Sequence, residues 1–134
     1  MTFPLTTAIY AAVLGLLAAI LTVNVILNRT RTRVLYGDGG DASLMQAIRA
    51  HCNFTEQAPL AIILIGLVEA FAYRQMFVHA LGAVLVLGRL LSAWGLATTP
   101  TLSFGRQAGA GLTIVVMVLA SALVLYAGAG TFMR

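Results

Sequence analysis

Four long apolar stretches constrain what this chain can fold into more than any other feature. They cover about residues 5–27, 44–71, 76–97 and 106–127. A hydrocarbon layer of about 30 Å is crossed by a helix of about 20 apolar residues, so each stretch is long enough for one crossing. We therefore expect an all-α membrane protein in which residues 1–134 form a single domain, a bundle of four transmembrane helices.

The composition agrees with this class and excludes others. The chain is 60% hydrophobic and only 9% charged, whereas a soluble domain carries about 25% charged residues. The net charge of +4 comes entirely from arginine, and no soluble basic surface with aromatic platforms is evident, so we expect no nucleic-acid partner. We interpret the arginines as topology determinants and anion ligands.

Three smaller features of the sequence bear on a disulfide framework, a signal peptide and a metal site. The single cysteine, Cys52, excludes an intrachain disulfide framework, and we interpret it as a small residue packed between helices. The first apolar stretch begins after Pro4 without the basic n-region or a convincing cleavage site of a signal peptide, so we expect that stretch to be retained. The glycine- and aspartate-rich run at residues 37–41 lacks the later ligands of a calcium loop, and we expect no metal site there, although Asp41 or Ser43 is suited to cap the next helix.

The second stretch carries three strongly polar residues on one stripe. On a helix, Asn53 lies about 40° from Arg49, and Glu56 lies about 20° the other way. A helix over residues 44–71 extends about 42 Å, longer than the hydrocarbon layer, so its first turns should project into the headgroup zone. Pro59 should bend this helix where the polar stripe meets the apolar span. Charges at the edge of a membrane span are costly unless they are paired or functional, so the stripe is a candidate site.

The remaining helices add two arginines and two packing patterns. Arg89 lies about 13 Å along the helix from Thr98, too deep to reach water unless it meets an acid or a ligand. Residues 98–101 interrupt the helical pattern after the third stretch, and Arg106 follows at the start of the fourth. The Gly105 and Gly109 pair, and a stripe of Ala11, Gly15 and Ala19, are typical of closely packed membrane helices.

Glu69 is interpreted as a paired interfacial carboxylate near Tyr73 and Arg74, in preference to a proton relay.

Four spans place both termini on the same side of the membrane. The first loop carries Arg29, Arg31 and Arg33, whereas the opposite side carries only Arg74 and Arg134. The positive-inside rule therefore predicts cytoplasmic loops and non-cytoplasmic termini. Five polar residues then fall toward the cytoplasmic half: Arg49, Asn53, Glu56, Arg89 and Arg106.

Several arginines and one carboxylate suit a small ligand that bears carboxylates and an amine. Arginine binds carboxylates bidentately and stays charged when buried, and Glu56 can receive an ammonium group. An arginine beside a thiol lowers the thiol pKa. Glutathione has all these groups, and the lipid would supply an apolar cosubstrate. A structural reading stays open, in which Arg49 pairs with Glu56 and Arg89 locks the third helix to its neighbour.

The run Arg49-Ala-His-x-Asn53-x-x-Glu56, followed by Pro59 and an apolar segment, resembles the signature of the MAPEG family, the membrane-associated proteins in eicosanoid and glutathione metabolism. The short loops and the Tyr36-Gly-Asp-Gly segment resemble the bacterial branch. The resemblance covers all four spans. It implies homotrimers of four-helix subunits that bind glutathione as cosubstrate between adjacent subunits at the cytoplasmic side.

Carried over residue by residue, the resemblance assigns roles to six positions. It implies that Arg106 stabilises the glutathione thiolate as the catalytic residue, and that the tripeptide is bound by Arg29, Arg49, Asn53, Glu56 and Arg89. Ser92 and Leu96 stand where the eicosanoid synthases carry other polar or tyrosine side chains, so the resemblance favours general glutathione chemistry over a specific eicosanoid synthase.

Our leading hypothesis is a multi-pass protein of the bacterial inner (plasma) membrane that acts as a glutathione-dependent transferase, or peroxidase, on hydrophobic electrophiles. Its expected partners are further copies of itself, membrane lipids and the small-molecule electrophile. Two alternatives stay open. One is a non-catalytic protein of the same fold that binds glutathione or lipid, and the other is a small proton-coupled transporter that uses Glu56 or Glu69.

Overall fold

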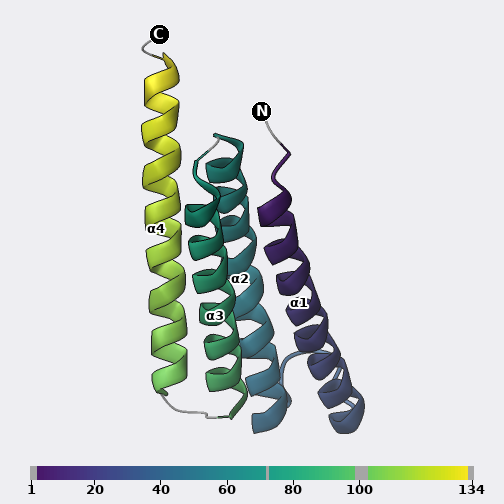
Figure 1. Ribbon diagram of the computed structural model, residues 1–134. Helices are drawn as coiled ribbons and strands as arrows, with labels where there is room; N and C mark the ends of the chain where they lie inside the picture. The colour runs from purple at the N-terminus through teal and green to yellow at the C-terminus, as the bar shows by residue number, and fades with distance from the viewer. Residues whose placement is uncertain (1–2, 72, 99–102, 133–134) are drawn as a thin grey trace.

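The structure, a computed structural model, describes residues 3–71, 73–98 and 103–132 and consists of four long helices (Figure 1). The helices are α1 (Leu5–Thr32), α2 (Ala42–Ala70), α3 (Gln75–Thr98) and α4 (Phe104–Phe132). Each contains a window apolar and long enough to cross a membrane. The all-α, four-span prediction is thereby confirmed. The expected chain break at Thr99–Thr101, together with Arg134, lies outside the described residues.

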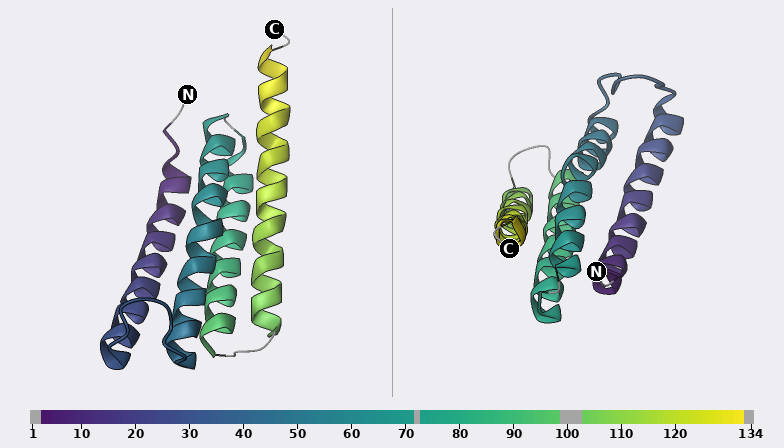
Figure 2. Two further views of the ribbon diagram at one scale, coloured as in Figure 1. Left: turned by 180° about the vertical axis from the view of Figure 1, so that it is seen from behind. Right: turned by 90° about the horizontal axis from the view of Figure 1, so that it is seen from above.

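The four helices lie side by side, with α2 and α3 in the middle (Figures 1 and 2). Helix α1 packs against α2 and α3, and α4 packs against α3 and α2, while the described parts of α1 and α4 do not touch each other. One end of the bundle, here the loop end, is where α1 and α3 finish and α2 and α4 begin. The other, the terminal end, holds both chain termini (Figure 1).

Helix α1 runs to Thr32, five residues beyond the predicted end of the apolar stretch. Polar residues near this end of the helix turn their side chains back along it and donate to carbonyls one turn earlier. Asn28 donates to the Asn24 carbonyl at 2.9 Å, and Thr30 donates to the Ile26 carbonyl at 3.0 Å. The helix ends where Arg33 adopts a left-handed conformation with φ of 58°. Side-chain bonds of this local kind do not appear in an apolar periodicity.

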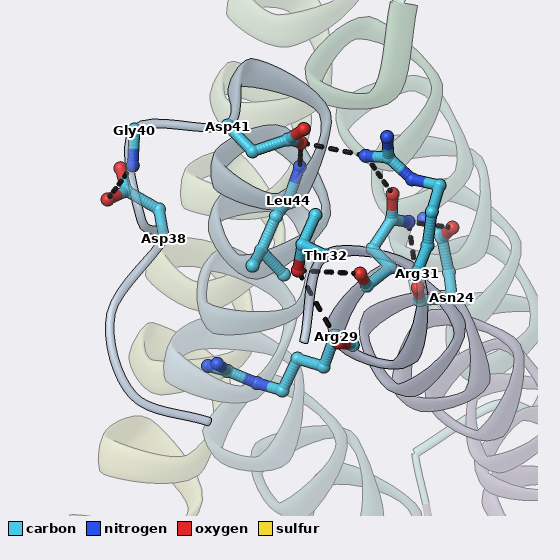
Figure 3. Close-up of polar contacts among 9 residues, drawn as sticks. Asn24, Arg29, Arg31, Thr32, Asp38, Gly40, Asp41 and Leu44 are labelled. Atoms are coloured by element: carbon cyan, nitrogen blue, oxygen red, sulfur yellow. Dashed lines mark hydrogen bonds and ion pairs between the residues drawn. The ribbon is translucent and has the colours of Figure 1, made fainter. Parts of the chain in front are cut away.

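The connection between α1 and α2 is fixed by Arg29 in the last turn of α1, whose side chain is drawn in Figure 3. The Nη1 group of Arg29 donates to the carbonyls of Val34 at 3.2 Å, Leu35 at 2.9 Å and Gly37 at 3.1 Å. A guanidinium charge is well suited to gather carbonyl oxygens that a turning backbone leaves without partners. Arg29 therefore folds this loop back against the end of α1.

The start of α2 is fixed by Asp41, as the capping prediction expected. Its Oδ1 accepts from the Leu44 backbone N–H at 2.8 Å and from Arg31 Nη2, also at 2.8 Å (Figure 3). The Leu44 N–H, assisted by the Arg31 guanidinium, lowers the pKa of Asp41 below its ordinary value. The two ends of the loop are thus joined by the ion pair between Arg31 and Asp41.

At the terminal end, Glu69 of α2 caps the start of α1. Its carboxylate is buried and accepts from the Thr6 N–H at 2.9 Å, the Thr7 N–H at 2.7 Å and the Thr7 hydroxyl at 2.7 Å. Helix α1 has no side-chain cap from Pro4, so its first N–H groups need an acceptor and their dipole favours a carboxylate. Glu69 is hydrogen-bonded at the end of its span, but to α1 and not to Arg74.

Helices α3 and α4 approach closely through glycines, as the Gly105 and Gly109 pattern predicted. A Cβ atom at Gly109 would lie 2.6 Å from the Ser92 backbone nitrogen, and one at Gly95 would lie 2.6 Å from the Arg106 nitrogen. Real Cβ contacts are essentially never this short, so these positions are restricted to glycine.

The small residues of α1 behave differently. Ala11, Gly15 and Ala19 are exposed, and a Cβ atom at Gly15 would meet nothing within 4 Å. This stripe therefore does not pack inside the described chain, and it leaves a shallow surface on the outside of the bundle.

Candidate functional site

The polar stripe of α2 lies on the face of the helix that the bundle does not cover. Arg49 and Glu56 are exposed and Asn53 is half-buried. The opposite face is held in the core by Ala50 and Phe54, which are 1% and 6% exposed. This alternation sets the orientation of the stripe, because burying the apolar residues turns the charged ones outward.

Arg49 and Glu56 do not pair with each other. Seven residues apart, their Cα atoms are separated by about 10.5 Å along the axis, and neither side chain has an ion-pair or hydrogen-bond partner in the described part of the chain. The purely structural reading of these two residues, as an ion pair across two turns, is therefore wrong. Two opposite charges remain available at one face, with Asn53 between them.

Arg89 lies beneath this stripe and is only 1% exposed. Its Nη1 donates to the carbonyl oxygen and to Oδ1 of Asn53, both at 3.2 Å. Its Nη2 donates to Ser92 Oγ at 3.1 Å and to the Gly109 carbonyl at 3.4 Å. One guanidinium group thus joins α2, α3 and α4. The expected partner was an acid or a ligand, and the observed partners are neutral oxygens.

Sequence reasoning missed the Gly109 carbonyl as a partner for Arg89. A backbone oxygen has no side-chain signature, and the available signal was indirect: the glycine pair on α4 that lets α3 approach. The same carbonyl also accepts from Thr113 Oγ1 at 2.9 Å. Ser92, which is 3% exposed, has its hydroxyl committed to Arg89 and does not face the stripe as a free group.

The other two arginines of the predicted site lie at the same end of the bundle. Arg106 is in the first turn of α4 and is half-buried, and its guanidinium makes no ion pair among the residues described. Its backbone N–H donates to Ser103 Oγ at 3.4 Å. Arg29 lies at the end of α1, where its Nη1 is occupied by loop carbonyls. The structure therefore brings Asn53 and Arg89 into direct contact and places Arg29 and Arg106 at the loop end, whereas Glu56 lies halfway along α2.

An apolar groove lies between α1 and α2. It has a volume of about 230 Å³, and its lining consists of Ala11, Leu14, Gly15, Ala18, Phe54, Ala58, Pro59 and Ile62. Phe54 and Ala58 belong to the buried face of α2, so the groove opens on a different side of this helix from the polar stripe. The outward-facing small residues of α1 form one wall of this groove.

These features define a class of protein: a four-span membrane bundle with an arginine from each of its four helices and one exposed carboxylate on α2. The sequence profile of the MAPEG family matches residues 7–126, and the chain belongs to that family. The inner membrane protein YecN of Escherichia coli strain K12 is 40% identical over 88 residues, which cover 66% of this chain and 67% of that protein. YecN of Escherichia coli O6:H1 strain CFT073 gives the same values.

Family membership, the four spans and the likeness to YecN together establish the location of the chain. It is a multi-pass integral inner membrane protein. This confirms the family and the localisation predicted from the sequence.

Proposed function

We propose that this protein is a membrane-bound, glutathione-dependent transferase that acts on hydrophobic electrophiles. One observation carries the proposal: Arg49 and Glu56 are exposed, lie on one stripe and have no partner in the part of the chain that the structure describes. Unpaired charges at the edge of a membrane span are costly and are retained where they bind something. A tripeptide with two carboxylates and an amine would satisfy both charges at once.

Each residue then has a chemical role in the proposed complex. Arg49 binds a carboxylate of glutathione, Glu56 receives its ammonium group, and Asn53 binds between them. Arg106 lies within reach of the thiol end and holds the thiolate by its charge. Because the stripe is uncovered in a single chain, we propose that a second subunit of a homotrimer closes the site.

The proposed reaction is a nucleophilic substitution. The Arg106 guanidinium lowers the thiol pKa of bound glutathione, so the thiol proton passes to solvent and a thiolate remains. The thiolate attacks an electrophilic carbon, a carbon–sulfur bond forms, and the leaving group departs with its electron pair. The electrophile reaches the sulfur from lipid.

We also propose that the loop end faces the cytoplasm and that both termini face the opposite side. Arg31 lies in the last turn of α1 and Arg33 directly follows this helix at the start of the loop, and both side chains are exposed. Arginines in short loops are retained on the cytoplasmic side during insertion. This orientation gives the proposed site direct access to soluble glutathione.

The test is conjugation of glutathione to chlorodinitrobenzene by the purified protein in detergent. The Arg106→Ala variant should lose about a hundredfold in kcat, the usual cost of removing one group that stabilises developing charge. Native mass spectrometry should show unchanged assembly. The matched control is Arg74→Ala, since Arg74 is an exposed arginine at the terminal end, and it should keep full activity. An inactive wild-type protein, or an active Arg106→Ala variant, contradicts the proposal.

A second candidate is a protein of the same fold that binds glutathione without turnover. The observation that favours it is the commitment of the Ser92 hydroxyl to Arg89, together with the apolar, buried Leu96 one turn further along α3. Ser92 is 3% exposed and Leu96 is apolar, so neither side chain presents a hydroxyl at the surface of the chain. Ultraviolet difference absorption of bound glutathione at neutral pH separates the two candidates, because only the transferase gives a thiolate signal.

A further inference from the structure

The side-chain amide of Asn53 has only one orientation that satisfies its neighbour. Arg89 Nη1 lies 3.2 Å from Asn53 Oδ1 and 3.2 Å from the Asn53 carbonyl oxygen. A guanidinium group can only donate hydrogen bonds, so the amide oxygen must face it. The amide NH₂ group must then point away from Arg89. Within the described chain, this NH₂ group has no acceptor.

Arg89 cannot adjust to the opposite orientation. It is 1% exposed, and its second nitrogen is held by Ser92 Oγ at 3.1 Å and by the Gly109 carbonyl at 3.4 Å. The guanidinium plane is rigid, so anchoring Nη2 also fixes Nη1. If the Asn53 amide flipped, its NH₂ group would face another donor, the Nη1 group of Arg89, and this bond would be lost.

We infer that Arg89 is a positioning residue that holds Asn53 as a hydrogen-bond donor toward the ligand, so that this position reads an acceptor oxygen. The inference rests on the proposed function. The exposed face of α2 then presents donors on adjacent turns, at Arg49 and Asn53, followed by one acceptor at Glu56. This order selects a ligand with a carboxylate or peptide carbonyl at one end and an ammonium group at the other.

The first test is the Asn53→Asp variant, measured by glutathione titration calorimetry and by chemical unfolding of the protein in detergent. Aspartate keeps an oxygen toward Arg89 but replaces the outward NH₂ with a second acceptor. We expect glutathione affinity to fall at least tenfold while the unfolding midpoint stays equal or rises. Thr55→Asp adds the same charge at an exposed neighbouring position off the stripe, and should change affinity less than twofold. Equal glutathione affinity in wild type and Asn53→Asp overturns the inference alone.

The second test is a double-mutant cycle between Arg89→Lys and Asn53→Ala. Lysine keeps the charge but cannot hold the two Asn53 oxygens and the Ser92 and Gly109 oxygens together. If Arg89 acts through Asn53, each single variant weakens glutathione binding about tenfold and the double variant is no weaker than either. Additive losses of about a hundredfold would mean that Arg89 contacts the ligand itself. Absence of glutathione binding to the wild-type protein would instead overturn the proposed function, and the inference with it.

Discussion

Replacing Gly109 by alanine should destabilise the bundle by separating α3 from α4. The added Cβ atom would lie 2.6 Å from the Ser92 backbone nitrogen, whereas ordinary contact begins at 3.4 Å. The Gly88 carbonyl oxygen and the Ser92 hydroxyl lie closer still. Two of these three atoms belong to the backbone of α3, so no side-chain rotation relieves the clash. The helices must move apart by at least roughly 0.8 Å, the difference between 3.4 Å and the 2.6 Å contact with the Ser92 nitrogen.

The magnitude follows from what that displacement removes. A radial gap of 0.5–1 Å forfeits about a quarter to a half of the dispersion energy between facing atoms. It also stretches the bond from Arg89 to the Gly109 carbonyl, which is already 3.4 Å long. Overpacking of this kind costs about 1–3 kcal/mol. The gain in helix propensity from glycine to alanine, at most about 1 kcal/mol, offsets only part of it.

The assay is reversible unfolding in mixed detergent, followed by circular dichroism. Gly111→Ala is the matched control, because Gly111 lies two residues away on the same helix and a Cβ atom there would meet nothing within 4 Å. Both variants gain the same helix propensity, so Gly109→Ala should be about 1–3 kcal/mol less stable than Gly111→Ala, and Gly111→Ala should leave the wild-type free energy of unfolding unchanged or raise it slightly. Equal stability of the two variants would refute the close approach of α3 and α4.

Two further predictions concern the ends of the bundle. Glu69→Gln should destabilise the docking of α1 by about 1–3 kcal/mol, because an amide cannot accept from all the Thr6 and Thr7 donors. Hydrogen exchange over residues 5–10 should therefore accelerate in this variant and stay unchanged in the exposed Glu56→Gln. Equal exchange in both variants would count against the cap. Asp41 has a lowered folded-state pKa, so its contribution to stability is present above its unfolded pKa of about 3.9 and is lost as the pH falls through the lower folded value. The Leu44 amide resonance should follow that acid transition in the wild type and not in Asp41→Asn; an identical pH response in both would contradict the capping role.

The general architecture was accessible from the sequence because membrane crossing leaves a strong compositional trace. The apolar stretches gave four helices, and the spacing of Arg49, Asn53 and Glu56 placed them on one face. The helix ends were less accessible, since the last turn of α1 depends on Asn28 and Thr30 bonding to local carbonyls. These bonds lie in a polar segment for which the pattern of apolar residues predicts a loop.

The partners of individual polar groups were not accessible, because they come from distant parts of the chain. Glu69 meets Thr6 and Thr7, and Arg89 meets a carbonyl of α4. Both pairings require that the helix order and tilt be known, and both involve backbone atoms that carry no residue signature. The bend expected at Pro59 stays a prediction, and α2 continues through this residue as one helix.

The most direct measurement is an experimental structure of the protein with glutathione bound in lipid or detergent. The account predicts that the tripeptide lies along the exposed face of α2, with a carboxylate on Arg49, its ammonium group at Glu56, an acceptor oxygen on the Asn53 NH₂ group and its sulfur beside Arg106. A structure at saturating glutathione in which this face is occupied only by lipid, or in which the tripeptide lies elsewhere, would contradict it.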